Sequence, residues 1–412
     1  MINIAILGYG TVGSGVVEVL KTNQDSIDKR AGKKINVKYV LDLRDFEGDP
    51  VQKLITHDVE EILRDEDIQV IVEVMGGVEP AYTFVKRALI SGKSVVTSNK
   101  ELVAKHGAEL LKIARKNKIN FLFEASVGGG IPIIRPLNKS LTADEITDIK
   151  GILNGTTNFI LSKMVDEGLD FETVLKEAQE KGYAERNPEA DVEGHDACRK
   201  IAILSSLAFG MHVNYEDIYT EGITKITKED MKYAKKLDCS IKLLAESKKV
   251  NDHVYAYVAP TLISEKHPLA NVNGVFNAIY VNGNVIGDVM FYGSGAGKLP
   301  TASAVVADVV DAAKHLDRNI ITFWSTKEMD LINISEVHAK VFLRIAYNNK
   351  EKAKADIQEV LGIEKYVEID DMDGEFGVVS DEWTQGEIEE KLKLLEEKES
   401  ILKVYNVIKW EY

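Results

Sequence analysis

The 412-residue sequence contains only two cysteines, Cys198 and Cys239. Two thiols are too few for a disulfide framework or a cysteine-based zinc site, which indicates a reducing compartment. No apolar run approaches the roughly 20 residues that a membrane-spanning helix needs. The N-terminus, MINIAILGYG, begins as a strand, without a charged leader or a cleavage site. We therefore expect a soluble, cytoplasmic protein with no membrane partner.

Positive charge is also scarce, because 51 Lys and Arg against 66 Asp and Glu give a net charge of -15. A protein that binds nucleic acid needs a basic stripe that releases counterions from phosphates. The sequence has no such stripe, so no nucleic-acid partner is expected. The composition is otherwise that of a globular protein, 45% hydrophobic and 28% charged, and the length suits two or three domains.

Residues 1–135 alternate apolar strand-like runs with helical patterns. The expected helices cover 80–90 and 102–116, and the expected strands are Ile2–Leu7, Ile35–Leu43, Val70–Met75, Ser94–Thr97 and Asn120–Phe123. Continuous apolar strands that alternate with helices indicate a parallel sheet covered on both faces. The fold class predicted here is α/β, a doubly wound dinucleotide-binding domain.

Over residues 136–298 the pattern changes and indicates a second domain of α+β type. This domain is expected to bind the substrate and to form the dimer. Its helical patterns precede strand-like stretches, with a hairpin turn at Val281–Asn284; the helices cover 156–167, 171–181 and 195–209, and the strands 254–258, 275–281 and 284–291. A helix rich in small residues, Thr301–His315, is expected to return to the first domain and complete it over about 299–320. The sheet of the second domain is expected to pack against another copy, giving a homodimer or homotetramer.

Residues 336–412 show a separate pattern of predicted strands and helices. The expected elements are strand 340–347, helix 350–360, strands 366–371 and 375–379, helix 385–399 and strand 402–412. The order βαββαβ is that of the ferredoxin-like unit.

A glycine pattern follows the first strand. Gly8-Tyr9-Gly10-Thr11-Val12-Gly13 matches G-x-G-x-x-G at the point where a helix begins. The glycines permit a tight turn, close approach of a pyrophosphate and close helix–strand packing, while the helix N-terminus supplies N–H groups to the phosphates. This position within a βαβ pattern predicts a dinucleotide site.

The end of the second strand bears on which dinucleotide binds. Asp42 is placed to accept hydrogen bonds from a ribose 2′-OH, which favours NAD, while Arg44 could instead reach the 2′-phosphate of NADP. The alternative for both residues is a solvated loop. The balance leans slightly to NAD.

Several longer motifs resemble homoserine dehydrogenase. They run in order along the chain: 74–81, 95–100, 124–132, 151–160, 182–191, 194–196 with Lys200, and 295–302. The resemblance implies NAD(P)(H)-dependent interconversion of L-aspartate 4-semialdehyde and L-homoserine, a small-molecule reaction on the route to threonine, methionine and isoleucine.

The resemblance also implies roles for individual residues. An aldehyde that accepts a hydride becomes an alkoxide, which needs a proton and electrostatic stabilisation. Lys200 and Lys100 are the two candidates, and the choice between them stays open. Asp196 would hold Lys200 and reach the substrate oxygen, and Glu185 would face the substrate ammonium. Further substrate contacts are assigned to Asn154, Thr157 and Tyr183, and further cofactor contacts to Thr97, Ser98, Lys100, Gly182 and Gly297.

Each of these residues also has an alternative reading. Asp196 and Lys200 are four residues apart, the spacing of an ordinary surface ion pair on a helix. Lys100 could simply begin a helix, Glu185 could lie in an exposed loop, and residues 154–157 could form only a turn and an N-cap. The motifs taken together favour the functional reading.

The segment 124–132 matches the family's site for a monovalent cation, usually sodium. The resemblance assigns Glu124, Val127, Gly129 and Ile131 to it. Glycines allow carbonyl groups to turn toward an ion, but they also permit a tight exit from a strand.

The C-terminal unit resembles an ACT domain, the amino-acid-sensing module of many homoserine dehydrogenases. The usual Asp-x-Pro-Gly-Val-Leu loop would fall near 348–354, where this chain reads Asn-Asn-Lys-Glu-Lys-Ala-Lys and lacks the glycine. A packing or dimerisation module without an effector is therefore the alternative.

Two other functions compete with the dehydrogenase. Aspartate-semialdehyde dehydrogenase needs a nucleophilic cysteine, but Cys198 lies inside a helical pattern and Cys239 in a charged stretch that is interpreted as helical. A non-catalytic binding protein is disfavoured by the intact set Lys100, Glu185, Asp196 and Lys200.

Overall fold

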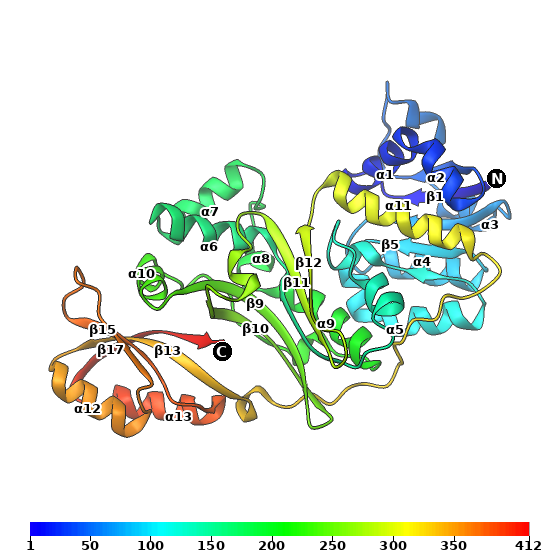
Figure 1. The fold of residues 1–412 in the computed structure, drawn as a ribbon. Coiled ribbons are helices and arrows are strands. Elements are labelled where there is room, and N and C mark those ends of the chain that lie inside the picture. The colour runs from blue at the N-terminus through cyan, green and yellow to red at the C-terminus, as the bar shows by residue number, and fades with distance from the viewer. Residues whose placement is uncertain (412) are drawn as a thin grey trace. The chain divides into compact units, whose positions relative to one another are not determined.

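A computed structural model describes residues 1–411 of the chain. Two compact units make up the fold (Figure 1). Unit 1 comprises Met1–Ile146, Ala202–Glu216 and Val281–Met329, and unit 2 comprises Thr147–Ile201, Asp217–Tyr280 and Asp330–Tyr412. Every helix within residues 1–411 is too short or too polar to span a bilayer.

Unit 1 is built on a parallel sheet of order β3-β2-β1-β4-β5-β6. This is the doubly wound order that places a ligand at the carboxyl ends of the strands, so the predicted α/β class is confirmed. The strands are β1 (Ile2–Leu7), β2 (Ile35–Leu41), β3 (Ile55–Thr56), β4 (Ile68–Glu73), β5 (Ser94–Thr97) and β6 (Phe121–Leu122); the helices are α1 (Thr11–Thr22), α2 (Gln24–Ala31), α3 (Val59–Arg64), α4 (Ala81–Ile90) and α5 (Lys100–Lys116).

Helix α11 (Lys298–Lys314) lies within unit 1. Ala302, Val305 and Val309 share one buried cluster with Val16 of α1 and Ile6 of β1. A Cβ at Gly15 of α1 would lie 2.9 Å from the carbonyl oxygen of Lys298. Small side chains therefore allow the two helices to approach closely.

Several elements of unit 1 were not predicted from the sequence. Helix α2 lies where only a polar insertion was expected. It was not predicted because Ile27 and Ala31 are its only buried residues, and two such residues give little hydrophobic periodicity. Strand β2 ends at Leu41 and not at Leu43, whose side chain is 94% exposed. Elements β3 and α3 are too short to give a clear pattern.

Unit 2 contains a mixed sheet in which strands follow the order β11-β7-β9-β10-β17-β13-β15-β14, with β8 on β10 and β16 on β13. Hairpin β11–β12 turns at residues 284–286. The strands are β7 (Ile146–Ile152), β8 (Tyr219–Thr220), β9 (Cys239–Val250), β10 (His253–Ser264) and β11 (Phe276–Gly283); the helices are α6 (Gly155–Glu167), α7 (Phe171–Glu180), α8 (Glu189–Val192) and α10 (Lys228–Lys236). Strand β12 (Gly287–Ser294) falls within unit 1, and helix α9 (His195–Phe209) begins in unit 2 and continues into unit 1 from Ala202.

The interpretation of the Cys239 segment as helical was wrong. Cys239 begins β9, which pairs with β10 along twelve residues. Lys242 and Glu246 of this strand are charged yet buried, so the alternation of polar and apolar residues that marks a strand is hidden.

The C-terminal module has the predicted βαββαβ order. Its strands follow the order β17-β13-β15-β14, with every neighbouring pair antiparallel, and it has its own apolar core. Its elements are β13 (His338–Tyr347), α12 (Lys350–Val360), β14 (Lys365–Val367), β15 (Glu375–Val379), β16 (Trp383–Thr384), α13 (Gln385–Glu396) and β17 (Ile401–Trp410); Tyr412, the end of the expected last strand, lies outside the described residues. Strand β17 also runs parallel to β10 at Thr261–Lys409 and Leu262–Trp410, which joins the module to the rest of the sheet. Short helical turns complete the chain at Pro50–Leu54, Glu124–Ser126, Pro136–Ser140, Tyr215–Asp217, Pro268–Asn271 and Ile334–Glu336.

A buried ion pair connects the module to α10. Arg344 of β13 donates to Asp230 at 2.8 Å, and the side chains are 6% and 0% exposed. Asp230 also accepts from the backbone N–H of Thr227 at 2.9 Å, forming the capping box that begins α10. One carboxylate therefore neutralises a buried guanidinium and caps a helix.

We expect Asp230→Ala to lower the free energy of unfolding by about 3–5 kcal/mol, because it leaves the buried charge of Arg344 without its closest partner. Asp230→Asn, which retains an acceptor for the cap, should cost less. Urea unfolding followed by fluorescence measures both. A loss below about 1 kcal/mol for Asp230→Ala would contradict the role assigned to the pair.

Candidate active site

The glycine-rich loop of unit 1 lies between β1 and α1. Gly8 has a φ of +100°, and a Cβ at Gly13 would lie 2.0 Å from the carbonyl oxygen of Gly8. A Cβ at Gly10, in contrast, would have no neighbour within 4 Å. Two glycines thus close the turn, while Gly10 leaves an open face at the N-terminus of α1, where Thr11 and Val12 begin the helix. The residues present fit a dinucleotide pyrophosphate at this face.

Asp42 lies beside this loop. Its carboxylate accepts from the backbone N–H of Tyr9 at 2.8 Å and from the guanidinium of Arg44 at 3.0 and 3.1 Å. The Arg44 hydrogen bonds, with those from the backbone, hold the pKa of Asp42 well below its usual range. Asp42 is therefore fixed at the loop as a carboxylate, while the Arg44 side chain is 62% exposed.

A buried carboxyl group organises the carboxyl ends of β4 and β5. Glu73 accepts from the hydroxyl of Thr97 at 2.6 Å and from the N–H of Met75 at 2.8 Å. Burial raises the pKa of Glu73. The N–H of Ser98 approaches the carbonyl of Glu73 at 3.4 Å. These contacts fix the start of the segment that leads to Lys100.

Asn99 sets the beginning of α5. Its side chain accepts from the N–H of Leu102 at 3.1 Å and donates to the carbonyl of Gly77 at 2.6 Å. Lys100, which is half-buried, is consequently the first residue of the helix. The resemblance also places Asn99, with Thr97 and Ser98, near the nicotinamide half of the cofactor, whereas no role was expected for Glu73.

Glu124 has a definite structural task. Its carboxylate accepts from three successive backbone N–H groups, those of Ile133, Ile134 and Arg135, at 2.6, 2.9 and 2.8 Å. Val127 and Ile131 are each 1% exposed, and Gly129 is buried with a φ of +56°. Residues 1–411 hold no cluster of three His, Cys, Asp or Glu side chains that could bind a metal.

The glycine-rich segment 128–130 packs against a second one, 294–297. The N–H of Gly130 donates to the carbonyl of Ser294 at 3.0 Å, and a Cβ at Gly129 would lie 2.2 Å from the carbonyl oxygen of Gly295. Gly297, with a φ of +117°, then begins α11. This contact between distant loops was not foreseen.

In unit 2, Asp196 and Lys200 form a buried pair near the start of α9. The ammonium donates to Asp196 Oδ2 and to the carbonyl of Leu153, each at 2.7 Å, and the two side chains are 7% and 11% exposed. An exposed surface pair is therefore the wrong reading. A pair held this far from water is costly to bury and needs further partners.

Asn154 supplies a further contact. Its Nδ2 donates to Asp196 at 2.9 Å and to Asp191 at 2.7 Å, and its Oδ1 accepts from the N–H of Thr157 at 2.9 Å. Asn154 is thus also the N-cap of α6. The structure brings together Asn154, Thr157, Asp196 and Lys200, and it adds Asp191, to which no role was assigned.

The remaining substrate candidates lie in the segment after α7. The carbonyl of Tyr183 accepts a hydrogen bond from the hydroxyl of Thr156 at 2.7 Å. The ring centroids of Tyr183 and Phe159 lie 5.1 Å apart. Gly182, with a φ of +73°, and Glu185 are exposed. This segment is tied to the start of α6 through its backbone, while Tyr183 remains 45% exposed.

Comparison with known proteins identifies the chain. A family model described as homoserine dehydrogenase matches residues 132–310, and one described as homoserine dehydrogenase, NAD binding domain, matches residues 8–124. The homoserine dehydrogenase of Bacillus subtilis (strain 168) is 44% identical over 84% of this chain and 81% of its own length. That of Neisseria gonorrhoeae is 37% identical over 100% and 98%.

Solved structures agree with this match. A homoserine dehydrogenase from Thiobacillus denitrificans superposes with a TM-score of 0.92 at 36% identity, covering 100% of this chain and 98% of its own. A hyperthermophilic archaeal homoserine dehydrogenase in complex with NADPH gives a TM-score of 0.65 at 30% identity, over 76% of this chain and 97% of its own. These matches confirm the resemblance inferred from the motifs. The chain belongs to the homoserine dehydrogenase family, as an oxidoreductase that binds NAD(P) and acts on a small-molecule substrate.

Proposed function

We propose that this chain interconverts L-aspartate 4-semialdehyde and L-homoserine with lysine-assisted proton transfer, on the route to threonine, methionine and isoleucine. The observation that carries the mechanism is the buried Lys200–Asp196 pair, which Asn154 holds in place. A bound nicotinamide cofactor supplies or accepts the hydride, and the protein supplies the proton and the binding groups.

Lys200 is proposed to donate the proton to the substrate oxygen. An ammonium has three N–H donors, and within residues 1–411 two of them are used, by Asp196 and by Leu153. The third remains for a substrate oxygen. Asp196 fixes the direction of the side chain and lies near enough to share the same ligand atom.

Lys100 of unit 1 and the exposed segment 182–185 of unit 2 are further residues with proposed roles. Lys100 follows Thr97 and Ser98 at the carboxyl end of β5, where doubly wound sheets bind ligands. Thr97, Ser98, Gly182 and Gly297 are proposed cofactor contacts. Glu185 carries the charge that a substrate α-ammonium requires, and Tyr183 and Thr157 are proposed to lie along the substrate.

The segment 124–131 is proposed to hold sodium or another monovalent cation through backbone carbonyls. The Glu124 carboxylate already accepts three N–H groups. Its part in such a site is therefore to hold the loop, while the carbonyl groups of Val127, Gly129 and Ile131 are the proposed ligands. Oxygen ligands of this kind suit hard cations.

We also propose the assembly and domain organisation inferred above. The domains are 1–135 with about 299–320, 136–298, and an ACT-like domain at 336–412, in a cytoplasmic homodimer or homotetramer. Size-exclusion chromatography with light scattering reports the number of chains in the assembly.

The absorbance of reduced nicotinamide, followed with L-homoserine and either NAD or NADP, tests the reaction itself. We expect Lys200→Ala to lower kcat by about 10²–10⁴-fold, because that is the usual contribution of a positioned proton donor. Lys100→Ala is measured in parallel, and Lys176→Ala, an exposed lysine of α7, serves as the control. A Lys200→Ala enzyme with kcat within about threefold of the native chain would assign the proton transfer elsewhere.

We expect Asp42 to favour NAD, since a carboxylate fixed beside the loop accepts a ribose hydroxyl and repels a 2′-phosphate. Asp42→Ser should remove that repulsion, free Arg44 and shift the ratio of kcat/KM for NADP over NAD upward by about tenfold, equivalent to ~1.4 kcal/mol. Arg44→Ala should shift the ratio the other way.

Both ratios come from initial rates with each cofactor, and Glu47→Ser, an exposed carboxylate nearby, is the control. If neither Asp42→Ser nor Arg44→Ala moves the ratio beyond the control, these residues do not select the cofactor.

A further inference from the structure

The carboxyl ends of β1 and β4 border the point where the strand order of the unit 1 sheet reverses. These two strands are neighbours, with β2 beside β1 and β5 beside β4. Doubly wound sheets bind dinucleotides in the crevice at such a point. Glu73 is the last residue of β4 and is 0% exposed. A buried carboxyl group therefore lies at the end of the sheet where the cofactor is expected.

One oxygen of Glu73 fixes the segment that follows β4, residues 74–77. Its Oε1 accepts from the backbone N–H of Met75 at 2.8 Å. This segment lies close to the glycine-rich loop, since a Cβ at Gly8 would be 3.1 Å from Cγ of Met75. Glu73 thereby holds Met75 beside the loop that the pyrophosphate is expected to approach.

The second oxygen of Glu73 closes a ring of hydrogen bonds with the segment that follows β5. Its Oε2 accepts from the hydroxyl of Thr97 at 2.6 Å, and Oγ1 of Thr97 accepts from the backbone N–H of Asn99 at 2.9 Å. The side-chain amide of Asn99 donates to the carbonyl of Gly77 at 2.6 Å, which leads back to the segment after β4. The ring therefore joins the two segments through protein groups alone.

Two glycines shape the segment after β4. Gly76 and Gly77 have φ values of +83° and +70°, a left-handed backbone that glycine adopts without strain. A Cβ at Gly76 would have no neighbour within 4 Å. The backbone is therefore open on this side, as it is at Gly10 of the glycine-rich loop.

A carboxyl group is costly to bury at this position. The groups that donate to Glu73 are neutral, and burial raises its pKa. A neutral side chain could join two strands at a lower cost of desolvation. A carboxylate, however, has two oxygens that accept from different directions, so one side chain orders both segments. Buried ionisable groups of this kind at a ligand cleft are typical of functional sites.

We infer that Glu73 is a positioning residue for the nicotinamide cofactor. It holds the segments after β4 and β5 at the spacing that the cofactor needs, and it acts through Met75, Thr97 and Asn99. Without these hydrogen bonds the cofactor itself would have to order both segments, which weakens its binding. The inference rests on NAD(P) binding, and it is independent of the proton transfer proposed for Lys200.

Titration of the full chain with NADPH and with NADH, followed by nicotinamide fluorescence, measures cofactor affinity without turnover. Glu73→Gln keeps the shape of the side chain but leaves one acceptor oxygen for two donors, so we expect the Kd to rise about tenfold. Glu66→Gln removes an exposed carboxylate before β4 and should leave the Kd within about twofold. Thermal unfolding of the free chain shows whether each variant is folded.

A second variant tests whether the ring acts as a unit. Asn99→Ser keeps an oxygen that can cap α5 but removes the donor to Gly77, and we expect a similar rise in Kd. The variant that combines Glu73→Gln with Asn99→Ser should bind within about threefold of the weaker single variant, because effects within one hydrogen-bond network are not additive.

Three results would each overturn the inference: an unchanged Kd in folded Glu73→Gln, losses that multiply to about a hundredfold in the combined variant, or no binding of NADPH or NADH by the native chain. A lower melting temperature with an unchanged Kd would assign Glu73 a purely structural task. A native chain that binds NADPH but does not oxidise L-homoserine would instead contradict the reaction proposed above.

Discussion

The cost of burying a positive charge governs the organisation of unit 2. An ammonium or guanidinium removed from water needs hydrogen bonds and a counter-charge, or it destabilises the fold. Three such groups have both, and a fourth, Lys242, has hydrogen bonds alone. Arg344 has Asp230, Lys150 has Asp148, Glu246 and Glu411, Lys242 has carbonyl and amide oxygens, and Lys200 has Asp196 and the carbonyl of Leu153. Burial lowers the pKa of Lys242 to about 8.

The same requirement explains how the candidate active site is built. Lys200 takes its two partners from α9 and from the end of β7, and Asn154 then joins Asp196 to Asp191 and caps α6. Three segments far apart in the sequence are thereby fixed around one ammonium. A catalytic group held from several directions loses little entropy when a ligand arrives, which is the purpose of a preorganised site.

Unit 1 could be predicted closely because its signals are local. The apolar runs of β1 and β5 and the glycine spacing after β1 describe their own structure, and the bounds of those strands match the prediction. Strand β9 could not be recognised, since its buried Lys242 and Glu246 are tolerated only through partners on other segments. Glu73 was missed for a related reason. The residues next to Glu73 in the sequence do not indicate that Thr97 of the adjacent strand will donate a hydrogen bond to it.

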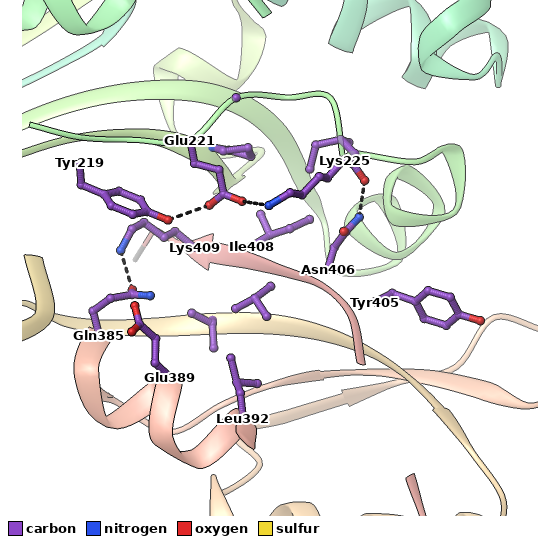
Figure 2. Close-up of a pocket in the computed structure, with 15 residues that line it drawn as sticks. Tyr219, Glu221, Lys225, Gln385, Glu389, Leu392, Tyr405, Asn406, Ile408 and Lys409 are labelled. Carbon is purple, nitrogen blue, oxygen red and sulfur yellow. Dashed lines mark hydrogen bonds and ion pairs between the residues drawn. The ribbon is translucent and has the colours of Figure 1, made fainter. Parts of the chain in front are cut away.

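The spacing of Asp196 and Lys200 does not by itself distinguish a surface ion pair from a buried one. Four residues on a helix bring a carboxylate to an ammonium whether the pair faces water or the interior. Burial decides between a minor surface contact and a functional group, and burial is set by Asn154 and Leu153, some forty residues away. Lys409 presents the converse case. Its residue type alone suggests a solvated side chain. It is nevertheless buried, with its ammonium 3.0 Å from Oε1 of Gln385 (Figure 2) and 4.9 Å from the ring of Tyr257.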